Sequence, residues 1–458
     1  MTPQQLAIPR TSEPDFPPHT SSYRHATSAF PRLVLPLETS ALNQPRTIRV
    51  ALAGCGVVGG GLVRLLHESA ASLASRFGVR FVITTVLVRD TTRDRKLPLD
   101  ARLLTDDLQA FLDHDADVVV EAVGGDEPAR SIAVSALRRG RKLITANKEL
   151  IANHGDSLHA LAAENLTALD FGAAVGGSAP VISTLRDLIG ASAPRSVRGI
   201  LNGTSNFVIS EIEGGNSLEA ALAAARGRGL AESDCTRDLD GSDAAAKLAI
   251  IGWIAFGIKP TELQIRIVPL PSNLEQLVRL APTIGARLRF IAECTRLDDN
   301  RVIASVEPAL VAQSSALART AGEENRVEVD LGWTSPLAVS GPGAGGAPTA
   351  AALLSDLVRR SAPPNDRGNG ATKFSPTIDE REHRWLIGAR LDIAAFKALA
   401  ADSELCPSQV FARDDYTIFI FERASWTRAE AIVSSLHAVN SSPFLARCEL
   451  APVAGRLE

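Results

Sequence analysis

The feature that most constrains the fold is a glycine-rich turn between a short apolar run and a helical repeat. Residues 47–53 (TIRVALA) are expected to form a buried strand, and a GxGxxG pattern follows before the apolar helical spacing of 57–73. The first glycine of such a turn permits a tight bend, the second lets backbone approach a pyrophosphate, and the third allows close packing of helix on strand. This predicts a dinucleotide site, with a ligand-free turn as the alternative. The residues expected to bind the dinucleotide here are Gly54, Gly56, Val57, Val58 and Gly59.

Strand-like and helix-like segments alternate after this turn. The runs 80–88 (RFVITTVLV), 117–122 (DVVVEA) and 142–146 (KLITA) are apolar and β-rich, and a helix is expected over 128–139. Strands separated by helices form parallel sheets, and nearly continuous apolarity is typical of strands buried on both faces. The sequence therefore predicts an α/β fold whose first domain, over 47–175, is a Rossmann-type parallel sheet.

Charged and glycine-rich residues follow the expected strands, at the carboxyl ends where such sheets bind ligands. Arg89 ends the second strand, just before Asp90. An arginine there accommodates a 2′-phosphate, so NADP is favoured over NAD, although a solvated charged loop is the alternative interpretation. Gly124 and Gly125 follow the third strand and Lys148 follows the fourth, and all three are expected to face the nicotinamide.

The rest of the chain is expected to add further units. Residues 176–340 mix helices and strands, which favours an α+β domain around an open sheet, and the glycine-rich turn and helix of 341–360 are expected to return to the nucleotide domain. Over 377–458 the order of elements is the βαββαβ pattern of ferredoxin-like domains. Residues 1–46, with eight prolines and no lysine, are predicted to be a disordered arm.

Composition excludes several classes of function. The formal net charge of −4 provides no basic field for nucleic acid. The longest apolar run, 248–258, is shorter than the roughly 20 residues that span a membrane. The five cysteines show neither zinc spacing nor a disulfide framework, and the histidines form no HxxxH or HExxH pattern. We therefore expect a cytoplasmic protein with a small-molecule substrate, without nucleic-acid or membrane partners or a histidine-built metal centre.

The densest acidic cluster of the chain is the candidate site of proton chemistry. Asp243 and Lys247 are spaced i and i+4, on one face of an expected helix, where the carboxylate can orient the amine. Lys148 and Lys247 are two of only seven lysines in an arginine-rich chain, and lysine, unlike arginine, can release a proton near neutrality. The carboxylates of Glu232 and Asp238 could bind the ammonium group of a substrate. A capped helix beside a solvated acidic loop is the alternative.

Taken in order, these motifs resemble the homoserine dehydrogenase family. The motifs are GxGxxG at 54–59, EAVGG at 121–125, TANK at 145–148, Gly-Thr at 203–204, the Asp-Gly-Asp-Lys signature within 238–247 and GPGAGG at 341–346. The resemblance implies a catalytic and dimerisation domain in a homodimer or homotetramer. It also implies NAD(P)-dependent interconversion of L-homoserine and L-aspartate 4-semialdehyde, in threonine, methionine and isoleucine biosynthesis.

Residue roles follow from the same resemblance. Lys247 matches the acid/base lysine of the family, Lys148 matches the lysine that contacts substrate and nicotinamide, and Asp243 matches a carboxylate beside them. The further matches to the substrate site are Glu232, Asp238, Thr204 and Gly229. Gly229 and Gly345 also match backbone positions beside the cofactor.

The resemblance further implies a monovalent cation, Na⁺ or K⁺, bound by the backbone carbonyls of Val175, Gly177 and Ala179. The family carries a glutamate in this loop where the present chain has Gly172. The carboxylate that accompanies the carbonyls in the family is therefore missing at this position.

The C-terminal segment resembles an ACT-type regulatory domain, which implies a threonine effector. It lacks the usual Asp-x-Pro-Gly turn and reads RLDI at 390–393.

In the acidic cluster, Leu230 replaces an aromatic residue of the family and Cys235 replaces a proline. The substitutions in the acidic cluster motivate one alternative, another Rossmann dehydrogenase acting on a related amino-acid aldehyde or alcohol. The second alternative is a cofactor-sensing paralogue without turnover, against which the intact Lys148 and Lys247 argue.

Overall fold

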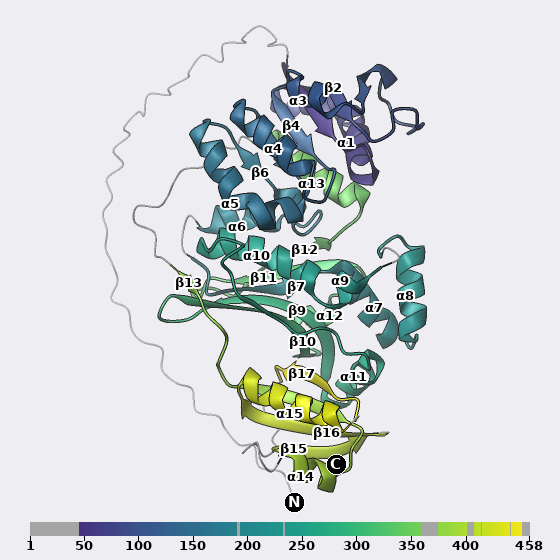
Figure 1. Ribbon diagram of the computed structural model, residues 1–458, viewed down its shortest axis with the longest axis vertical. Helices are drawn as coiled ribbons and strands as arrows, with labels where there is room; N and C mark the ends of the chain where they lie inside the picture. Colours follow the sequence, from purple (N-terminus) through teal and green to yellow (C-terminus); the bar gives the residue numbers. More distant parts are fainter. Residues whose placement is uncertain are drawn as a thin grey trace, which may run out of the picture. The chain divides into compact units, whose positions relative to one another are not determined.

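Residues from Pro45 onward form one compact unit. The computed structural model describes residues 45–189, 193–231, 234–359, 374–400, 407–413, 415–439 and 441–450 (Figure 1). The predicted N-terminal arm lies outside these ranges except for Pro45 and Arg46. Within the described ranges, no helix is both long enough and apolar enough to cross a membrane.

The first layer is sheet A, six parallel strands in the order β3-β2-β1-β4-β5-β6. The strands are β1 (Arg46–Ala53), β2 (Val79–Leu87), β3 (Leu104–Thr105), β4 (Val118–Glu121), β5 (Lys142–Thr145) and β6 (Leu169–Asp170). The helices between them are α1 (Val57–Glu68), α2 (Ala70–Phe77), α3 (Leu108–Asp113), α4 (Ala129–Arg138) and α5 (Lys148–Glu164). The predicted Rossmann-type sheet is confirmed. Its strand order reverses between β1 and β4, and such a reversal creates a ligand-binding crevice at the carboxyl ends of the strands.

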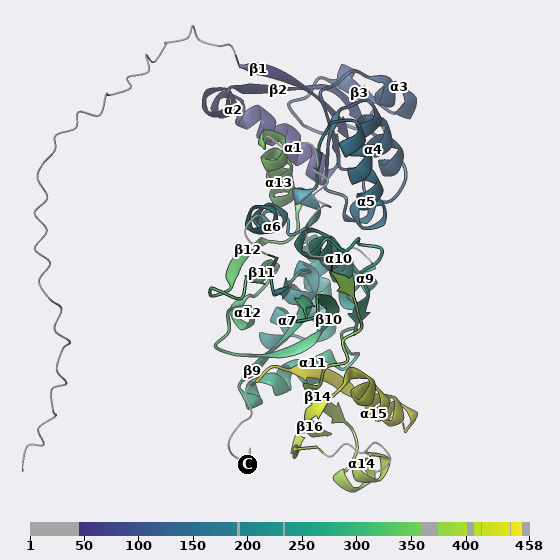
Figure 2. The same ribbon diagram turned by 90° about the vertical axis from the view of Figure 1, so that its left-hand side faces the viewer.

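Both faces of sheet A are covered, which explains the nearly continuous apolarity of its strands. Val50 and Leu52 of β1 pack in a core with α1 and with α13 (Gly346–Val358), whereas Ala51 and Ala53 face the core that contains α4 and α5. Figure 2 shows α1 and α13 on one side of the sheet and α4 and α5 on the other. The glycine-rich segment that precedes α13 is thereby brought back to the nucleotide-binding turn.

The helices of this region differ from the prediction in two places. The helical repeat expected over 57–73 is interrupted at Ser69, which ends α1 and precedes α2. Helix α5 was not anticipated at all. It begins at Lys148 because the Asn147 carboxamide oxygen accepts hydrogen bonds from the backbone N–H groups of Glu149 and Leu150, both at 3.1 Å.

The second layer is sheet B, eleven strands whose main path is β12-β11-β7-β9-β10-β17-β14-β16-β15, with β8 and β13 paired to β10. Its first strands are β7 (Ser196–Ile200), β8 (Ile265–Ile267), β9 (Ala286–Arg296), β10 (Arg301–Ala312), β11 (Glu324–Asp330), β12 (Leu337–Pro342) and β13 (Ser375–Pro376). The helices of this region are α6 (Val181–Ile189), α7 (Gly203–Glu213), α8 (Leu218–Gly227), α9 (Thr236–Leu239), α10 (Ser242–Phe256), α11 (Leu274–Leu280) and α12 (Ala316–Arg319). Helix α10 is apolar on nearly all sides and is correspondingly buried between the layers.

The C-terminal elements appear in the predicted βαββαβ order. They are β14 (His383–Ala389), α14 (Ile393–Ala400), β15 (Gln409–Arg413), β16 (Tyr416–Ala424), α15 (Trp426–Ala438) and β17 (Phe444–Cys448). Their strand order, β17-β14-β16-β15, is antiparallel throughout and has its own aromatic core. The C-terminal strands are continuous with the other strands of sheet B, because β17 pairs in parallel with β10 at Ala309 and Leu310.

Candidate active site

A cavity of about 770 Å³ opens above the glycine-rich turn at the carboxyl ends of β1, β2 and β4. Gly54, Gly56 and Val57 line it. Gly54 has φ +91°, and a Cβ there would lie 2.5 Å from the carbonyl oxygen of Ala122. A Cβ on Gly59 would lie 2.0 Å from the carbonyl oxygen of Gly54, so the third glycine serves helix–strand packing. This cradle leaves the start of α1 open to a pyrophosphate.

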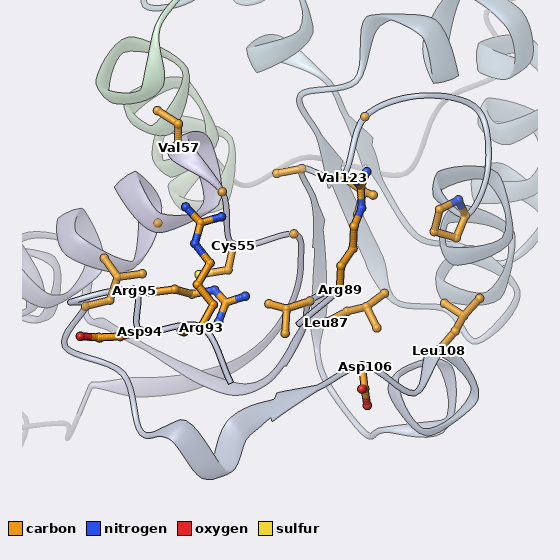
Figure 3. A pocket seen from close by; sticks show the side chains of 18 of the residues that line it. Cys55, Val57, Leu87, Arg89, Arg93, Asp94, Arg95, Asp106, Leu108 and Val123 are labelled. Carbon is orange, nitrogen blue, oxygen red and sulfur yellow. Dashed lines mark hydrogen bonds between the residues drawn. The ribbon is translucent and has the colours of Figure 1, made fainter. Parts of the chain in front are cut away.

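Several arginines surround the outer part of this cavity, where the ribose of a bound dinucleotide is expected. Arg89, Arg93 and Arg95 line it, together with Arg64. Figure 3 shows Arg93 and Arg95 on the side of Cys55, and Arg89 pointing toward Val123. The carboxylate of Asp90 instead accepts hydrogen bonds from the backbone N–H (2.8 Å) and the hydroxyl (2.6 Å) of Thr92. Asp94, Asp106 and Glu127 also line the cavity, so its four arginines leave a small positive excess there.

The second cavity, of about 350 Å³, adjoins the first and shares Ala122, Val123 and Gly124 with it. Glu121 shapes this shared wall, because its carboxylate accepts hydrogen bonds from the backbone N–H groups of Val123 (2.8 Å) and Gly124 (3.2 Å) and from the Thr145 hydroxyl. Asn147 completes it by donating to the carbonyl of Gly125 at 2.6 Å. The EAVGG and TANK motifs thus form one hydrogen-bonded unit between the two cavities.

Two amines meet at one carboxylate in the second cavity. Lys247 and Asp243 lie on α10, and Lys247 Nζ is 2.7 Å from Asp243 Oδ2. Lys148 comes from the other layer, at the start of α5, and its Nζ is 3.1 Å from Asp243 Oδ1. The side chain of Lys148 is 31% exposed and that of Lys247 is 11% exposed. Both predicted catalytic lysines therefore line the cavity that adjoins the dinucleotide cradle.

Asn202 links the carboxylates of this cavity and was not identified from the sequence. Its Nδ2 donates to Asp238 Oδ1 at 2.7 Å and to Asp243 Oδ2 at 2.8 Å, while its Oδ1 accepts from the backbone N–H of Ser205. The preceding carbonyl, of Leu201, accepts a hydrogen bond of 2.9 Å from Lys247 Nζ. An asparagine at the cap of a helix that starts with Gly-Thr was the available signal, but it is equally typical of a purely structural cap.

The two carboxylates differ electrostatically. Burial acts to raise the pKa of Asp243, but the nearby charges of Lys247 and Lys148 outweigh it and hold the pKa well below its usual range. Burial raises the pKa of Asp238, and the neighbouring negative charge of Asp243 adds to this effect. Asp243 is thus a permanently charged holder of both amines, whereas Asp238 is a half-buried carboxylate at the cavity wall.

The remaining predicted residues are distributed unevenly. Thr204 lines the second cavity, and its hydroxyl donates to the carbonyl of Leu230 at 2.8 Å. Val58 lines the same cavity, beside Gly343 and Ala344 of the glycine-rich turn. Glu232 lies outside the described residues. Four other predicted glycines are absent from the described linings of both cavities: Gly59, Gly125, Gly229 and Gly345.

The loop with the predicted cation ligands forms part of the wall of the second cavity, through Gly176 and Gly177. Gly176 and Gly177 have positive φ, and Gly177 lies against the backbone of Pro342 and Gly343. The carbonyl of Ala179 accepts a hydrogen bond of 2.8 Å from the N–H of Val181. Across the described ranges, no cluster of three or more His, Cys, Asp and Glu side chains is arranged to hold a metal ion.

At Gly172, where the family has a glutamate, the space beside the backbone is occupied by a side chain of helix α13. A Cβ on Gly172 would lie only 2.8 Å from Oδ1 of Asp356, a residue of α13. A carboxylate thus lies beside this loop although residue 172 has no side chain.

A dinucleotide cradle that opens onto paired amines is typical of a nicotinamide-dependent oxidoreductase. The sequence model described as Homoserine dehydrogenase matches residues 180–358, and the one described as Homoserine dehydrogenase, NAD binding domain matches 54–171. The chain belongs to the homoserine dehydrogenase family, whose members are NAD(P)-dependent oxidoreductases.

Individual relatives support this assignment over most of the chain. A homoserine dehydrogenase of Mycobacterium tuberculosis (strain ATCC 25618 / H37Rv) is 37% identical over 338 residues, which are 72% of this chain and 76% of the relative. One of Bacillus subtilis (strain 168) is 33% identical over 315 residues, 68% of this chain and 72% of the relative. The crystal structure of a homoserine dehydrogenase from Thiobacillus denitrificans is similar with a TM-score of 0.78 at 28% identity, over 90% of this chain and 99% of that one.

Proposed function

We propose that the protein interconverts L-homoserine and L-aspartate 4-semialdehyde in the second cavity, with NADP in the first. The observation that carries this proposal is the meeting of Lys148 and Lys247, from separate layers, at the carboxylate of Asp243 beside the dinucleotide cradle. A nicotinamide bound in the first cavity would supply the hydride acceptor for oxidation of the carbinol carbon and the hydride donor for the reverse reaction. The protein must therefore move the hydroxyl proton and hold the amino acid in place.

The proposed roles follow from position. Lys247 removes the hydroxyl proton as the alcohol is oxidised and returns it in the reverse direction, because its amine lies in the cavity and is oriented by Asp243 and by the Leu201 carbonyl. Lys148, on the cofactor side, binds the reacting oxygen. Asp238 binds the substrate ammonium group, and Glu232 is a second candidate for this role. Excluding bulk water from the cavity strengthens each of these interactions.

The preference for NADP rests on the charge around the first cavity. Arg89, Arg93 and Arg95 line it, whereas the Asp90 carboxylate is engaged by Thr92. Guanidinium groups match a 2′-phosphate, whereas the two hydrogen bonds from Thr92 hold Asp90 through Oδ1.

We propose two further ligand sites. The carbonyls of Val175, Gly177 and Ala179 would hold Na⁺ or K⁺, with no carboxylate at position 172. The C-terminal βαββαβ module would bind threonine as an effector. A cavity of about 420 Å³ between α11 and β16, lined by Arg279, Asp415 and Tyr416 among others, is the proposed place.

A single set of initial rates tests these proposals. We expect oxidation of L-homoserine with NADP⁺ at a higher kcat/KM than with NAD⁺, and Arg89→Ala should lower kcat/KM for NADP⁺ roughly tenfold while changing that for NAD⁺ little. Replacing KCl or NaCl by choline chloride tests the cation, and millimolar threonine tests the effector. Turnover of a different amino alcohol in place of homoserine would support the alternative substrate, and binding of NADPH without any turnover would support the sensing paralogue.

A further inference from the structure

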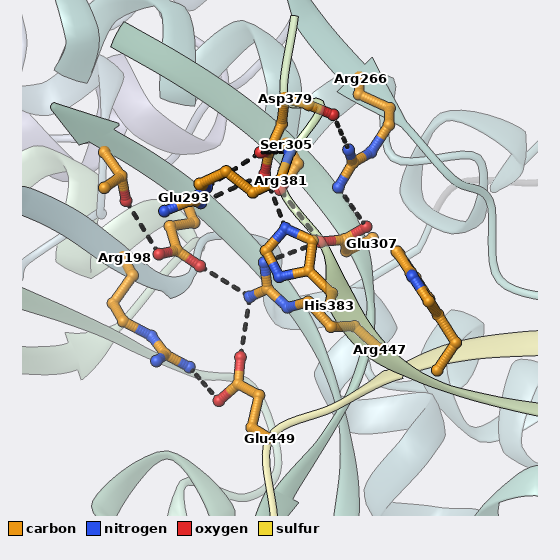
Figure 4. A network of polar contacts seen from close by, with 12 residues as sticks. Arg198, Arg266, Glu293, Ser305, Glu307, Asp379, Arg381, His383, Arg447 and Glu449 are labelled. Atoms are coloured by element: carbon orange, nitrogen blue, oxygen red, sulfur yellow. Dashed lines mark hydrogen bonds and ion pairs between the residues drawn. The ribbon is translucent and has the colours of Figure 1, made fainter. Parts of the chain in front are cut away.

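A buried network of charges joins the C-terminal module, which comprises β14–β17 with α14 and α15, to the catalytic layer, which comprises the other strands of sheet B (Figure 4). It alternates arginines and glutamates from five strands of sheet B and from the residue that follows β17. Its core members are Arg198, Arg266, Glu293, Glu307, Arg447 and Glu449. Three positive and three negative side chains balance one another, which permits their burial.

Arg447 of β17 is the centre of this network. Its guanidinium is 2.7 Å from Glu293 Oε2, 2.9 Å from Glu307 Oε1 and 2.8 Å from Glu449 Oε1, and its side chain is only 7% exposed. Burial acts to raise the pKa of Glu293, but Arg447 and Arg198 lower it to about 2. Arg447 therefore fixes β17 against β9 and β10 through permanently charged contacts.

The network also reaches β7, a strand of the catalytic layer that pairs with β11 and β9 and not with a strand of the C-terminal module. Glu449 Oε2 is 2.7 Å from Arg198 Nη2, and Arg198 lies opposite Glu293 in the register of β7 with β9. Glu449 thus bridges Arg447 of the module and Arg198 of β7. The pair is partly buried, with side-chain exposures of 26% for Arg198 and 21% for Glu449.

Strand β7 leads directly to the catalytic amine. It ends at Ile200, and the next two residues are Leu201, whose carbonyl accepts from Lys247 Nζ at 2.9 Å, and Asn202, which donates to Asp243 at 2.8 Å. Arg198 precedes Leu201 by only three residues, which is about 10 Å of extended chain. A displacement of β7 along its axis would therefore move the carbonyl that holds Lys247.

We infer that Arg198 and Glu449 are positioning residues for Lys247: their ion pair lets the C-terminal module set the place of β7 and hence of the amine. The inference rests on the proposed role of Lys247 in proton transfer. A contact that only attaches the module to the catalytic layer would leave the geometry of Leu201 and Lys247 unchanged. The experiment must therefore separate attachment from positioning.

The central comparison is between Arg198→Met and Arg326→Met. Arg326 lies on the neighbouring strand β11 and pairs with Glu328 of the same strand at 2.9 Å, with side-chain exposures of 23% and 21% that match those of Arg198 and Glu449. We expect Arg198→Met to lower kcat for homoserine oxidation about tenfold, since displacements below 1 Å at a reacting group cost this much, with the KM for the dinucleotide unchanged. Arg326→Met should keep the wild-type kcat.

Glu449→Gln provides the second test: it keeps the volume of the side chain but replaces one of its two accepting oxygens by an NH2 group, which cannot accept a hydrogen bond from arginine. We expect a loss of kcat similar to that of Arg198→Met, no further loss in the double variant, and partial recovery in Arg198→Lys. Arg447 is left intact, because its removal would leave buried carboxylates uncompensated. Glu449→Gln also carries the comparison if Arg198→Met does not fold.

Amide hydrogen exchange gives a readout that does not depend on the substrate. Exchange in the segment 199–206 should be faster in Arg198→Met and Glu449→Gln than in the wild type and in Arg326→Met. A kcat within twofold of wild type, an equal loss in Arg326→Met, or additive losses in the double variant would each overturn the positioning role. A wild-type protein that fails to oxidise homoserine would count against the proposed function, and the exchange data would still decide whether the C-terminal module controls β7.

Discussion

Two clusters in this protein contain the same number of charges and use them differently. Each has two carboxylates and two cationic side chains. The amine cluster, in the second cavity, is Lys148, Asp238, Asp243 and Lys247; the closed cluster, behind the predicted cation loop, is Lys142, Asp170, Arg186 and Asp356. In each of them one carboxylate contacts both cations, and the other carboxylate has a raised pKa.

Access to ligand separates the two clusters, whereas solvent exposure does not: the side chain of Arg186 is 29% exposed and that of Lys148 is 31% exposed. In the closed cluster, Asp170 is 2.9 Å from Lys142 and 3.0 Å from Arg186, and its side chain is 1% exposed. Lys142 Nζ also donates to the carbonyls of Asp356 (2.6 Å) and Arg359 (3.0 Å), which ties the end of α13 to sheet A. The amine cluster instead lines a cavity. The two clusters therefore have the same set of charges and differ in that only the amine cluster lines a cavity beside the dinucleotide cradle.

The largest difference between the clusters should appear when each loses a lysine. We expect Lys247→Ala to lower kcat by ~10²-fold or more, as for loss of a general acid/base, while the dinucleotide still binds. Lys142→Ala is the matched change in the closed cluster, and we expect it to lower the thermal unfolding temperature while kcat of the folded protein stays near that of the wild type. Stopped-flow turnover measures kcat of both variants, NADPH fluorescence titration measures dinucleotide binding, and thermal unfolding measures the loss of stability. Near-normal turnover of Lys247→Ala would remove the proposed distinction.

The sequence allowed one cluster to be predicted and concealed the other. Asp243 and Lys247 are one helical turn apart, and Lys148 follows a strand that must end at the ligand edge, but that they share one site followed from the family resemblance. The closed cluster brings together β5, β6, α6 and α13, and no spacing in the chain links Asp356 to Gly172. Asn202 could not be predicted as a site residue, because asparagine caps many helices that have no other role. The pairing of β17 with β10 could not be predicted either, because pairing between edge strands leaves no local sequence pattern.

A smaller effect on turnover is expected at the second carboxylate of the amine cluster. Asp238→Asn removes the charge proposed to bind the substrate ammonium group and should lower kcat/KM for homoserine roughly tenfold or more, mainly through KM. Burial raises the pKa of Asp238, so in the wild type kcat/KM should fall as pH is lowered through that pKa. The variant should lack this acid limb. The measurement is the pH profile of kcat/KM for both proteins, and an unchanged profile in Asp238→Asn would contradict the assignment.

The smallest effect on turnover, and the clearest on stability, is expected for the corresponding carboxylate of the closed cluster. Burial and the charge of Asp170 raise the pKa of Asp356 to about 6. Between the ordinary pKa of an aspartate, near 4, and this value, the folded protein keeps a proton that the unfolded chain releases, so the contribution of Asp356 to the free energy of unfolding decreases as pH rises through this interval and then levels off.

Replacing Asp356 by asparagine should remove that dependence. A shift of this size corresponds to about 3 kcal/mol, so Asp356→Asn should gain up to this much stability relative to the wild type as pH increases from 4 to 8, with kcat nearly unchanged. Urea unfolding of both proteins at pH 4.5, 6 and 8 measures the difference, and Asp170→Asn is the control, because Asp170 contacts both cations and its loss should destabilise the fold at pH 8. If Asp356→Asn were instead less stable than the wild type at pH 8, Asp356 would be a needed partner of Lys142 and Arg186 rather than the surplus carboxylate, and the parallel with Asp238 would fail.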